Sequence, residues 1–205
     1  MKKISTVFEI DYENSKIATN VVRPENQWVI DGEGDATVKY DGTAVLIMNQ
    51  MPFKRYDRKL TKYWKKNFNK IENFTEDMFK IPPQGFVPVK NQKPDLTTGH
   101  WPGWVPITSS PEDKYHNEGI ENYINKYNKI PDGTFELIGP KVQGNPYELQ
   151  EHILVKHGSL IVFPERSYEG IKKWLEDNFV EGLVFHGNNK KMAKIRRKDF
   201  GLSWN

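Results

Sequence analysis

The 205-residue chain contains no cysteine. This absence excludes disulfide bonds, thiolate nucleophiles and cysteine-based zinc sites, so nothing here requires an oxidising compartment. Long apolar runs are also missing, and no stretch approaches the roughly 20 apolar residues that a membrane-spanning helix needs. The first eleven residues reach acidic side chains before any long apolar stretch, which does not match a secretion signal. We expect an intracellular, cytoplasmic protein in a reducing environment, with no membrane partner.

A strong excess of one charge sign is missing as well. Lysine and arginine number 30 and aspartate and glutamate 27, a formal net charge of +3, which permits a polyanionic partner without requiring one. Aromatic residues are plentiful, with 6 Trp, 9 Tyr and 11 Phe, and we assign most of them to core filling rather than base stacking. This length predicts one sizeable domain rather than two. We expect a monomer.

The first half of the chain favours strands. Residues 36–48 are rich in β-favouring side chains on both sides of Asp41-Gly42, which predicts a strand, a tight turn and a second strand. A returning strand with one apolar and one cationic face is predicted over 49–59. The apolar positions between 60 and 71 fit a helical stripe. Seven prolines between 82 and 111 predict little regular structure. A domain linker is one interpretation, but we expect Gly99–Pro106 to form a packed surface loop.

The second half alternates helical and strand patterns. Helical spacing over 120–127 predicts a short amphipathic helix, and Ser167 is placed to cap another helix that extends to about 179. Together these patterns predict an α+β fold with mainly antiparallel sheets and flanking helices. The remaining predicted strands cover residues 134–139 and 159–163, and a hairpin pairs 181–186 with 192–196.

Lys39 ends the first predicted strand, directly before Tyr40-Asp41-Gly42. A lysine amine attacks phosphorus only after it loses its proton, and burial together with a nearby cation lowers its pKa for this purpose. By itself, however, a lysine before Asp-Gly is common by chance. A strand that ends in a hairpin turn explains it more simply.

Other charged residues follow Lys39 in a defined order: a basic strand with Lys54, Arg55 and Arg58, then Glu136, Glu181-Gly182 and Lys194-Ile195-Arg196. With this order the chain resembles RNA ligases of the covalent nucleotidyltransferase superfamily. It is more similar to the small ATP-dependent 5′-3′ RNA ligases, a family with a vertebrate member and compact microbial or viral relatives. The likeness runs from about Ala36 to Trp204, in segments 36–43, 56–59, 103–106, 136–139, 144–147, 157–158, 181–182 and 194–204.

The resemblance implies the nucleotidyltransferase (adenylyltransferase) domain of ATP-dependent ligases. Residues 1–205 would be a single minimal domain of this kind, without a separate OB-fold domain, because only about ten residues follow the Lys194 strand. The implied activity is ATP-dependent sealing of RNA 5′-phosphate and 3′-hydroxyl ends through a lysyl-AMP and an RNA-adenylate intermediate. A viral or bacterial origin would be compatible with so compact a chain.

The resemblance also implies roles for individual residues. Lys39 would carry AMP, the backbone at Thr37 and Val38 would contact the adenine edge, and Glu136 would bind the ribose hydroxyls. Glu181 would hold Mg²⁺ or Mn²⁺, unless it pairs with a nearby lysine. Phe163 would stack on adenine, or else belong to the core.

Basic residues would neutralise the phosphates. Lys194 and Arg196 alternate along a strand and therefore share a face, although Arg197 and Lys198 crowd the segment and a solvated basic strand is the alternative. Arg58, or otherwise Arg55, would contact the nucleotide or the RNA 5′-phosphate; their spacing places them on opposite faces, so only one does so. Lys54, Arg55 and Arg58 would contribute to RNA binding.

The histidines and tryptophans are assigned structural roles. His100, His152 and His157 show no metal-ligand spacing and are expected to make local hydrogen bonds. Trp101 and Trp104 either stack on RNA bases or anchor the proline-rich segment, and we expect anchoring.

Two other functions fit the same residues. One is a guanylyltransferase of the mRNA-capping kind, which uses GTP, and the other is a non-catalytic RNA-binding module of the same fold. The combined presence of Lys39, Glu136, Glu181 and Lys194 argues against the binding module, because binding alone would not need all four.

Overall fold

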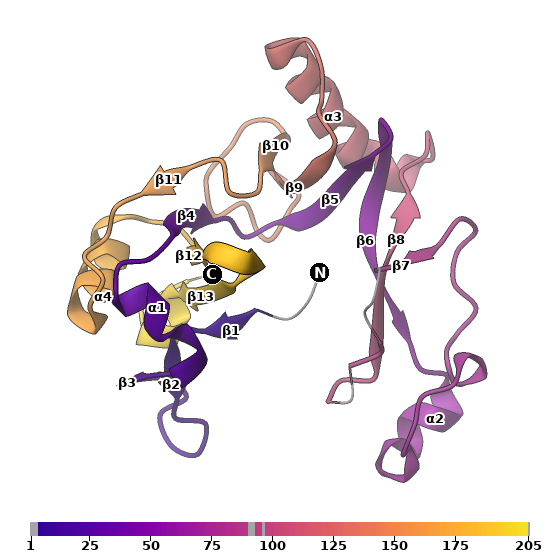
Figure 1. The fold of residues 1–205 in the computed structure, drawn as a ribbon. Helices are drawn as coiled ribbons and strands as arrows, with labels where there is room; N and C mark the ends of the chain where they lie inside the picture. Colours follow the sequence, from indigo (N-terminus) through magenta and orange to yellow (C-terminus); the bar gives the residue numbers. More distant parts are fainter. Residues whose placement is uncertain (1–3, 90–92, 96, 205) are drawn as a thin grey trace.

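The computed structural model describes residues 4–89, 93–95 and 97–204. Two larger sheets dominate the fold, and the chain crosses from one to the other between β4 and β5 (Figure 1). Within the described residues, no helix has the length and apolar character needed to cross a lipid bilayer. The five-stranded sheet contains, in spatial order, β1 (Ser5–Thr6), β13 (Met192–Arg196), β12 (Gly182–His186), β4 (Asp35–Lys39) and β11 (Ile161–Val162).

The second sheet has six strands, and a short two-stranded sheet pairs β2 (Phe8–Ile10) with β3 (Ala18–Val22). Every named strand pair is antiparallel except β1 with β13. The predicted α+β fold with mainly antiparallel sheets is therefore confirmed. The six-stranded sheet contains, in order, β10 (Ile153–Lys156), β9 (Gly133–Ile138), β5 (Thr43–Met48), β6 (Met51–Lys59), β8 (His100–Pro106) and β7 (Val87–Pro88).

One face of the five-stranded sheet forms the larger hydrophobic core. Ala36, Phe185 and Ala193 lie side by side on β4, β12 and β13, and all three are fully buried. Helices α1 (Gln27–Ile30) and α4 (Tyr168–Asp177) contribute to this core. The predicted cap of α4 is confirmed, because the Ser167 hydroxyl oxygen accepts a 2.9 Å hydrogen bond from the Gly170 amide. The apolar stripe of α4 buries Ile171 completely.

The six-stranded sheet has its own core on the face covered by α3 (Lys114–Tyr127). Val45, Phe135 and Leu137 are fully buried there, and Tyr123 of α3 packs edge-on against Phe135. The helix predicted over 120–127 is confirmed, although it begins six residues earlier, at Lys114. The remaining helical turns are α2 (Lys62–Lys66) and the 3₁₀ turns Pro24–Asn26, Phe68–Lys70, Glu76–Met78, Pro111–Asp113, Asn188–Lys190 and Arg197–Phe200.

The predicted hairpin around Asp41-Gly42 is wrong. β4 pairs with β11 and β12, whereas β5 pairs with β6 and β9, so this turn connects two sheets instead of two partners. Gly42 is needed because the backbone of β9 approaches closely: a Cβ at position 42 would lie 2.2 Å from the carbonyl oxygen of Leu137. The strand end that carries Lys39 therefore lies where the two sheets meet.

Other element predictions need correction. Gly99–Pro106, expected to be a loop, is mostly β8, which pairs with β6 from Phe53↔Pro106 to Lys59↔His100. The helix expected over 60–71 is reduced to the five residues of α2, followed by a 3₁₀ turn. The strand expected over 159–163 is only two residues long, and β10 was not predicted. The hairpin of β12 and β13 is confirmed.

Candidate active site

A cavity of about 520 Å³ lies between the two larger sheets, next to Lys39. A larger groove of about 1050 Å³ between α3 and β10 contains none of the predicted site residues. The cavity is therefore the candidate site. It is lined by Thr37, Val38, Lys39, Val184, His186 and Met192 from the five-stranded sheet, by Leu46, Trp104, Thr134 and Glu136 from the six-stranded sheet, and by Ile4, Tyr40, Val89, His157 and Gly158.

Strand register brings the basic residues to one face of the five-stranded sheet. Lys39 is opposite Gly182, and Gly182 is opposite Arg196; one rung further, Thr37, Val184 and Lys194 are aligned. Residues directly opposite one another in a sheet point to the same side. Lys194 and Arg196 therefore share the face of Lys39, as their alternate spacing predicted. Arg197 does not, because its buried side chain donates to the carbonyl oxygens of Asn178 and Ser203.

Lys39 forms an ion pair with Glu181, in which the ammonium group donates to Oε2. The Lys39 side chain is 27% exposed and that of Glu181 only 11%. Burial raises the pKa of Glu181, while the positive charge of Lys39 opposes this rise. A carboxylate in such surroundings needs a cation beside it. The pairing with a nearby lysine, one of the two sequence-based alternatives for Glu181, is present in this structure.

Lys194 and Arg196 differ in how their charges are used. Burial, followed by the charges of Arg196 and Lys39, lowers the pKa of Lys194. Among the ion pairs of the described residues, none involves Lys194. Arg196 is held by Asp199, with Nη2 2.7 Å from Oδ1 and Nε 3.1 Å from Oδ2. Lys194 is thus a partly buried cation available to an anionic ligand.

Two residues outside the predicted site hold the segment after Lys39. The Asp41 amide donates to the Tyr147 hydroxyl at 2.7 Å, and Trp204 Nε1 donates to Asp41 Oδ2 at 2.8 Å. Tyr147 also packs edge-on against Tyr40, with ring centroids 5.5 Å apart. Burial raises the pKa of Tyr147, so its phenol stays protonated. Tyr147 and Trp204 both lie in segments that carry the family resemblance, and this resemblance is the sequence signal that could have identified them.

Glu136 lies across the cavity on β9, with its side chain 15% exposed. The hydrogen-bond donor that such a carboxylate needs is His157, whose Nε2 is 2.7 Å from Glu136 Oε2. The expected local role of His157 is confirmed. His152 likewise contacts Glu118, with Nδ1 2.9 Å from Oε1.

His186 was not predicted as a site residue. Its Nε2 lies 2.9 Å from Thr37 Oγ1, and the Thr37 hydroxyl also lies 3.1 Å from the Val184 carbonyl oxygen. Because the carbonyl can only accept, the hydroxyl donates to it, and His186 Nε2 donates to Thr37. Burial lowers the pKa of His186, which favours the neutral ring. The only sequence signal for this residue was its position in the predicted hairpin.

The basic residues of β6 fall on opposite faces, as their spacing predicted. Arg55 is opposite Trp104, a cavity residue, and its guanidinium lies 5.8 Å from the Trp104 ring centroid. Lys54 lies on the other face, 2.5 Å from Asp113 Oδ1. Arg58, only 4% exposed, donates to Glu76 at 3.0 Å and to the Lys80 carbonyl oxygen at 2.6 Å. Of the two arginines, Arg55 is therefore the one on the cavity face.

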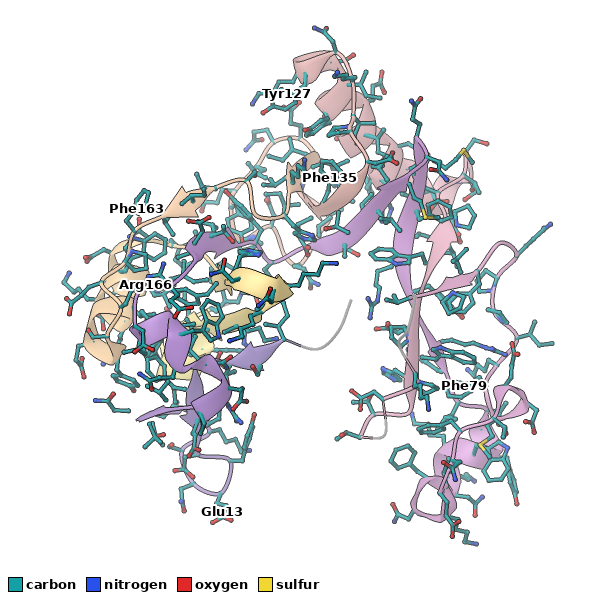
Figure 2. The ribbon with its side chains drawn as sticks, viewed as in Figure 1. Glu13, Phe79, Tyr127, Phe135, Phe163 and Arg166 are labelled. Atoms are coloured by element: carbon teal, nitrogen blue, oxygen red, sulfur yellow. The ribbon has the colours of Figure 1, made fainter. Side chains whose placement is uncertain are left out.

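The remaining predicted residues have different surroundings. Phe163 is 88% exposed and does not line the cavity, so the core alternative for it is wrong; Figure 2 shows it beyond the end of β11. Trp104 and Trp101 belong to β8 rather than to a loop, and Trp101 packs against Phe79 at 5.4 Å. The described residues contain no cluster of three or more His, Asp or Glu side chains suited to a metal ion.

Lys39 thus lines the cavity, is paired with Glu181 and shares a sheet face with Lys194, while Glu136 lies across the cavity on the other sheet.

Comparison with known proteins identifies the family. The model of the RNA ligase 1 family matches residues 112–205. RNA ligase 1 of Mus musculus is 30% identical over 220 residues, which cover 82% of this chain and 67% of the mouse protein. RNA ligase 1 of Danio rerio is 30% identical over 221 residues, 82% and 68% of the two chains. The chain belongs to the RNA ligase 1 family.

Proposed function

We propose that this protein is an ATP-dependent RNA ligase that joins RNA 5′-phosphate and 3′-hydroxyl ends through a lysyl-AMP and then an RNA-adenylate. The observation that carries the proposal is the position of Lys39, which lines the cavity, is paired with Glu181 and shares a sheet face with Lys194 and Arg196. The relatives named RNA ligase 1 support it. We further infer that residues 1–205 form one nucleotidyltransferase unit of the ATP-dependent ligase type.

Activation of Lys39 requires the loss of a proton, because an ammonium group has no electron pair for attack. The Glu181 carboxylate stabilises the ammonium form, so Lys39 must first separate from it. Glu181 fits a divalent cation: it is a buried carboxylate whose pKa stays raised by burial even beside Lys39, so a stronger positive charge would favour its ionised form. Mg²⁺ or Mn²⁺ held there, directly or through water, would supply positive charge that disfavours the ammonium form of Lys39 and neutralises phosphate oxygens.

The chemical step follows from the neutral amine. Lys39 releases its proton to water, and its Nζ forms a bond to the α-phosphorus of ATP while the bond to the bridging oxygen breaks. Pyrophosphate leaves with that electron pair. Lys194 and Arg196 stabilise the negative charge on the phosphates, and their fixed positions on β13 mean that little reorganisation is needed. The 5′-phosphate of RNA then takes AMP from Lys39, and a 3′-hydroxyl displaces AMP to form the phosphodiester.

The nucleotide contacts are assigned by position. Glu136, oriented by His157, binds the ribose hydroxyls, and the β4 backbone at Thr37 and Val38 contacts the adenine edge. Arg55 contacts the nucleotide or the RNA 5′-phosphate. Lys54 and Arg58 are omitted because their side chains lie on the other face of the sheet, away from the cavity. Phe163 is omitted because it lies outside the cavity lining.

The test is transfer of label from α-labelled ATP or GTP to the protein in the presence of Mg²⁺. We expect an acid-labile label from ATP that is absent in Lys39→Ala and retained in Lys173→Ala, a matched change on an exposed helix surface. The labelled protein should pass AMP to 5′-phosphorylated RNA. Label from GTP alone would instead identify a guanylyltransferase. No label from either nucleotide, with RNA binding intact, would identify a binding module.

A further inference from the structure

The segment between β6 and β8 forms a separate projection. Residues 59–80, which we call the basic arm, contain the end of β6, helix α2 and two 3₁₀ turns. Figure 1 shows α2 beyond the end of the β6–β8 strand pair, away from α3. The site described above uses none of the arm's side chains, so its composition needs another explanation.

Positive charge is concentrated where the arm begins. Between Asp57 and Glu72 the chain carries six basic residues and no acidic ones: Arg58, Lys59, Lys62, Lys65, Lys66 and Lys70. The whole chain has a net charge of +3 from 30 basic and 27 acidic residues, so the remainder, with 24 basic residues, has a net charge of −3. This one short segment therefore changes the net charge of the chain from negative to positive.

Five of these charges are directed at solvent without internal compensation. Arg58 is buried and paired with Glu76, but the five lysines are exposed, and no ion pair among the described residues includes any of them. Lys62, Lys65 and Lys66 are three and four residues apart on α2 and so share one face. Like charges at this spacing destabilise a helix. Such a cluster is better explained by an anionic partner than by folding.

An exposed aromatic side chain accompanies the lysines. Tyr63 is 65% exposed and is three residues before Lys66, on an adjacent part of the helix surface. Its ring makes a T-shaped contact with Trp64 at 5.1 Å, and because most of the residue is exposed, the ring is accessible to a flat partner. Cationic side chains beside an exposed aromatic ring are the combination that binds single-stranded nucleic acids, because the cations attract the phosphates and unpaired bases stack on the ring.

The arm is also held in place. Phe79 joins Leu60 through a β-bridge, packs against Phe74 at 5.5 Å and against Trp101 at 5.4 Å, and lies under the Arg58 guanidinium at 5.7 Å. This aromatic cluster fixes the arm to β6 and β8. A surface that is already ordered loses less conformational entropy when it binds a partner.

We propose that the basic arm binds the phosphate backbone of a single-stranded RNA segment whose reactive end occupies the cavity. The proposal rests on the RNA ligase function above and names the surface that holds its substrate. Along β6, Arg55 on the cavity face and Lys59 at the arm are four residues apart, about 13 Å. That length corresponds to about four nucleotides stacked at 3.4 Å. The arm would therefore contact the strand a few nucleotides from its reacting end.

The test compares two variants that lose the same charge. The arm variant replaces four lysines of the basic arm with Gln: Lys62, Lys65, Lys66 and Lys70. The control variant replaces four exposed lysines elsewhere with Gln: Lys16, Lys126, Lys129 and Lys173. Glutamine keeps good helix propensity, so α2 is retained. Affinity for a 5′-phosphorylated single-stranded RNA is measured by fluorescence anisotropy, without ATP, between 50 and 250 mM KCl.

We expect the arm variant to bind RNA at least tenfold more weakly at 100 mM KCl, and its log–log salt slope to fall by about 2 to 3, since each lost phosphate contact on a single strand removes about 0.7. The control variant should stay within threefold of the unaltered protein. Equal losses in both variants, or an unchanged slope in the arm variant, would overturn the proposal.

Two further measurements separate this proposal from the ligase function. Lys39 labelling by ATP alone should be unchanged in the arm variant, which also shows that the protein is folded. If the unaltered protein takes no label but its RNA binding still depends on the arm, the ligase function is wrong and the RNA-binding surface is supported. Tyr63→Ala should weaken RNA binding about tenfold with little change in salt slope, and unaltered affinity would remove Tyr63 from the site.

Discussion

Strands β6 and β13 are both rich in basic residues, yet their charges have different surroundings. On β6, Lys54 and Arg58 face away from the cavity and are neutralised by Asp113 and Glu76. On β13, Lys194 faces the cavity side without an ion-pair partner among the described residues. A basic strand in sequence thus has two physical outcomes, and the acid supplied by a distant segment decides between them.

The paired cations of β6 and the cation of β13 that is unpaired within the described residues are therefore expected to have different roles, the former in stability and the latter in chemistry. A cation that neutralises a buried acid stabilises the fold, because its removal leaves an uncompensated charge. A cation that is shielded from water without a partner costs stability and is explained by a ligand that is anionic. Substitutions on the two strands should therefore affect different measurements.

Lys194→Met should have the largest effect. Loss of one preorganised charge at the phosphates should slow adenylylation of Lys39 by about 10²- to 10³-fold. The protein should be no less stable, since burial already disfavours the Lys194 charge. Rate is measured by single-turnover labelling and stability by thermal unfolding. A normal labelling rate together with a lowered unfolding temperature would mean that Lys194 stabilises the fold and does not act in the reaction.

The same residue predicts a pH effect. Because the pKa of Lys194 is lower in the folded protein, the unfolded chain binds more protons between the folded pKa and about 10.4. Lys194 therefore costs stability at neutral pH, and this cost disappears as the pH rises through that interval. The stability difference between Lys194→Met and the unaltered protein should narrow toward about pH 10, as urea unfolding at a series of pH values would show.

Arg58→Met should affect stability instead of rate. Its side chain donates to Glu76 and to the Lys80 carbonyl oxygen, and its guanidinium lies over the Phe79 ring of the basic arm. Loss of these bonds from a buried position should lower the free energy of unfolding by about 2–4 kcal/mol. Urea unfolding measures it. Labelling of Lys39 at 20 °C should be unchanged, and a slower rate would mean that the opposite face of β6 contributes to chemistry.

Lys54→Met should cost about 1–3 kcal/mol of stability, because Asp113 is 1% exposed and loses its cation. Burial alone would raise the pKa of Asp113, but bonds from Lys54 and Thr108 outweigh it and lower that pKa. A lowered carboxylate pKa stabilises the fold above about pH 4 and stops doing so as the pH falls below that value. The deficit of Lys54→Met should therefore shrink in acid; a constant deficit would point to lost packing.

His157→Gln should have the smallest effect. His157 orients Glu136 through a single hydrogen bond, so its loss should raise the ATP concentration for half-maximal labelling about threefold to tenfold. The maximal rate should change less, because Lys39 and Lys194 are untouched. An equal fall in maximal rate at saturating ATP would mean that His157 acts at the phosphates.

Sequence patterns predicted the elements whose signals are local. The cap and apolar stripe of α4, and the alternation along β12 and β13, depend on neighbouring residues and are confirmed. β8 was missed because Pro102, Gly103 and Pro106 argue against a strand. Its outer edge is paired with only the two residues of β7 in the described chain, and proline is tolerated at such an edge.

The site was predictable only in part. The family resemblance assigned Lys39, Glu181, Lys194 and Arg196 to one site, and alternation along one strand predicted the shared face of Lys194 and Arg196. The partners of Lys54 and Arg58 depend on contacts across 59 and 18 residues, which no local pattern encodes. The crossing at Asp41-Gly42 was missed for the same reason, since a turn's sequence does not state which strand pairs next.

The most direct test of the central claim is to locate the AMP group on the protein. After incubation with ATP and Mg²⁺, intact mass followed by peptide mass spectrometry should show one AMP, on the peptide that contains Lys39, and none in Lys39→Ala. An adduct on another lysine, or one that persists in Lys39→Ala, would contradict the account.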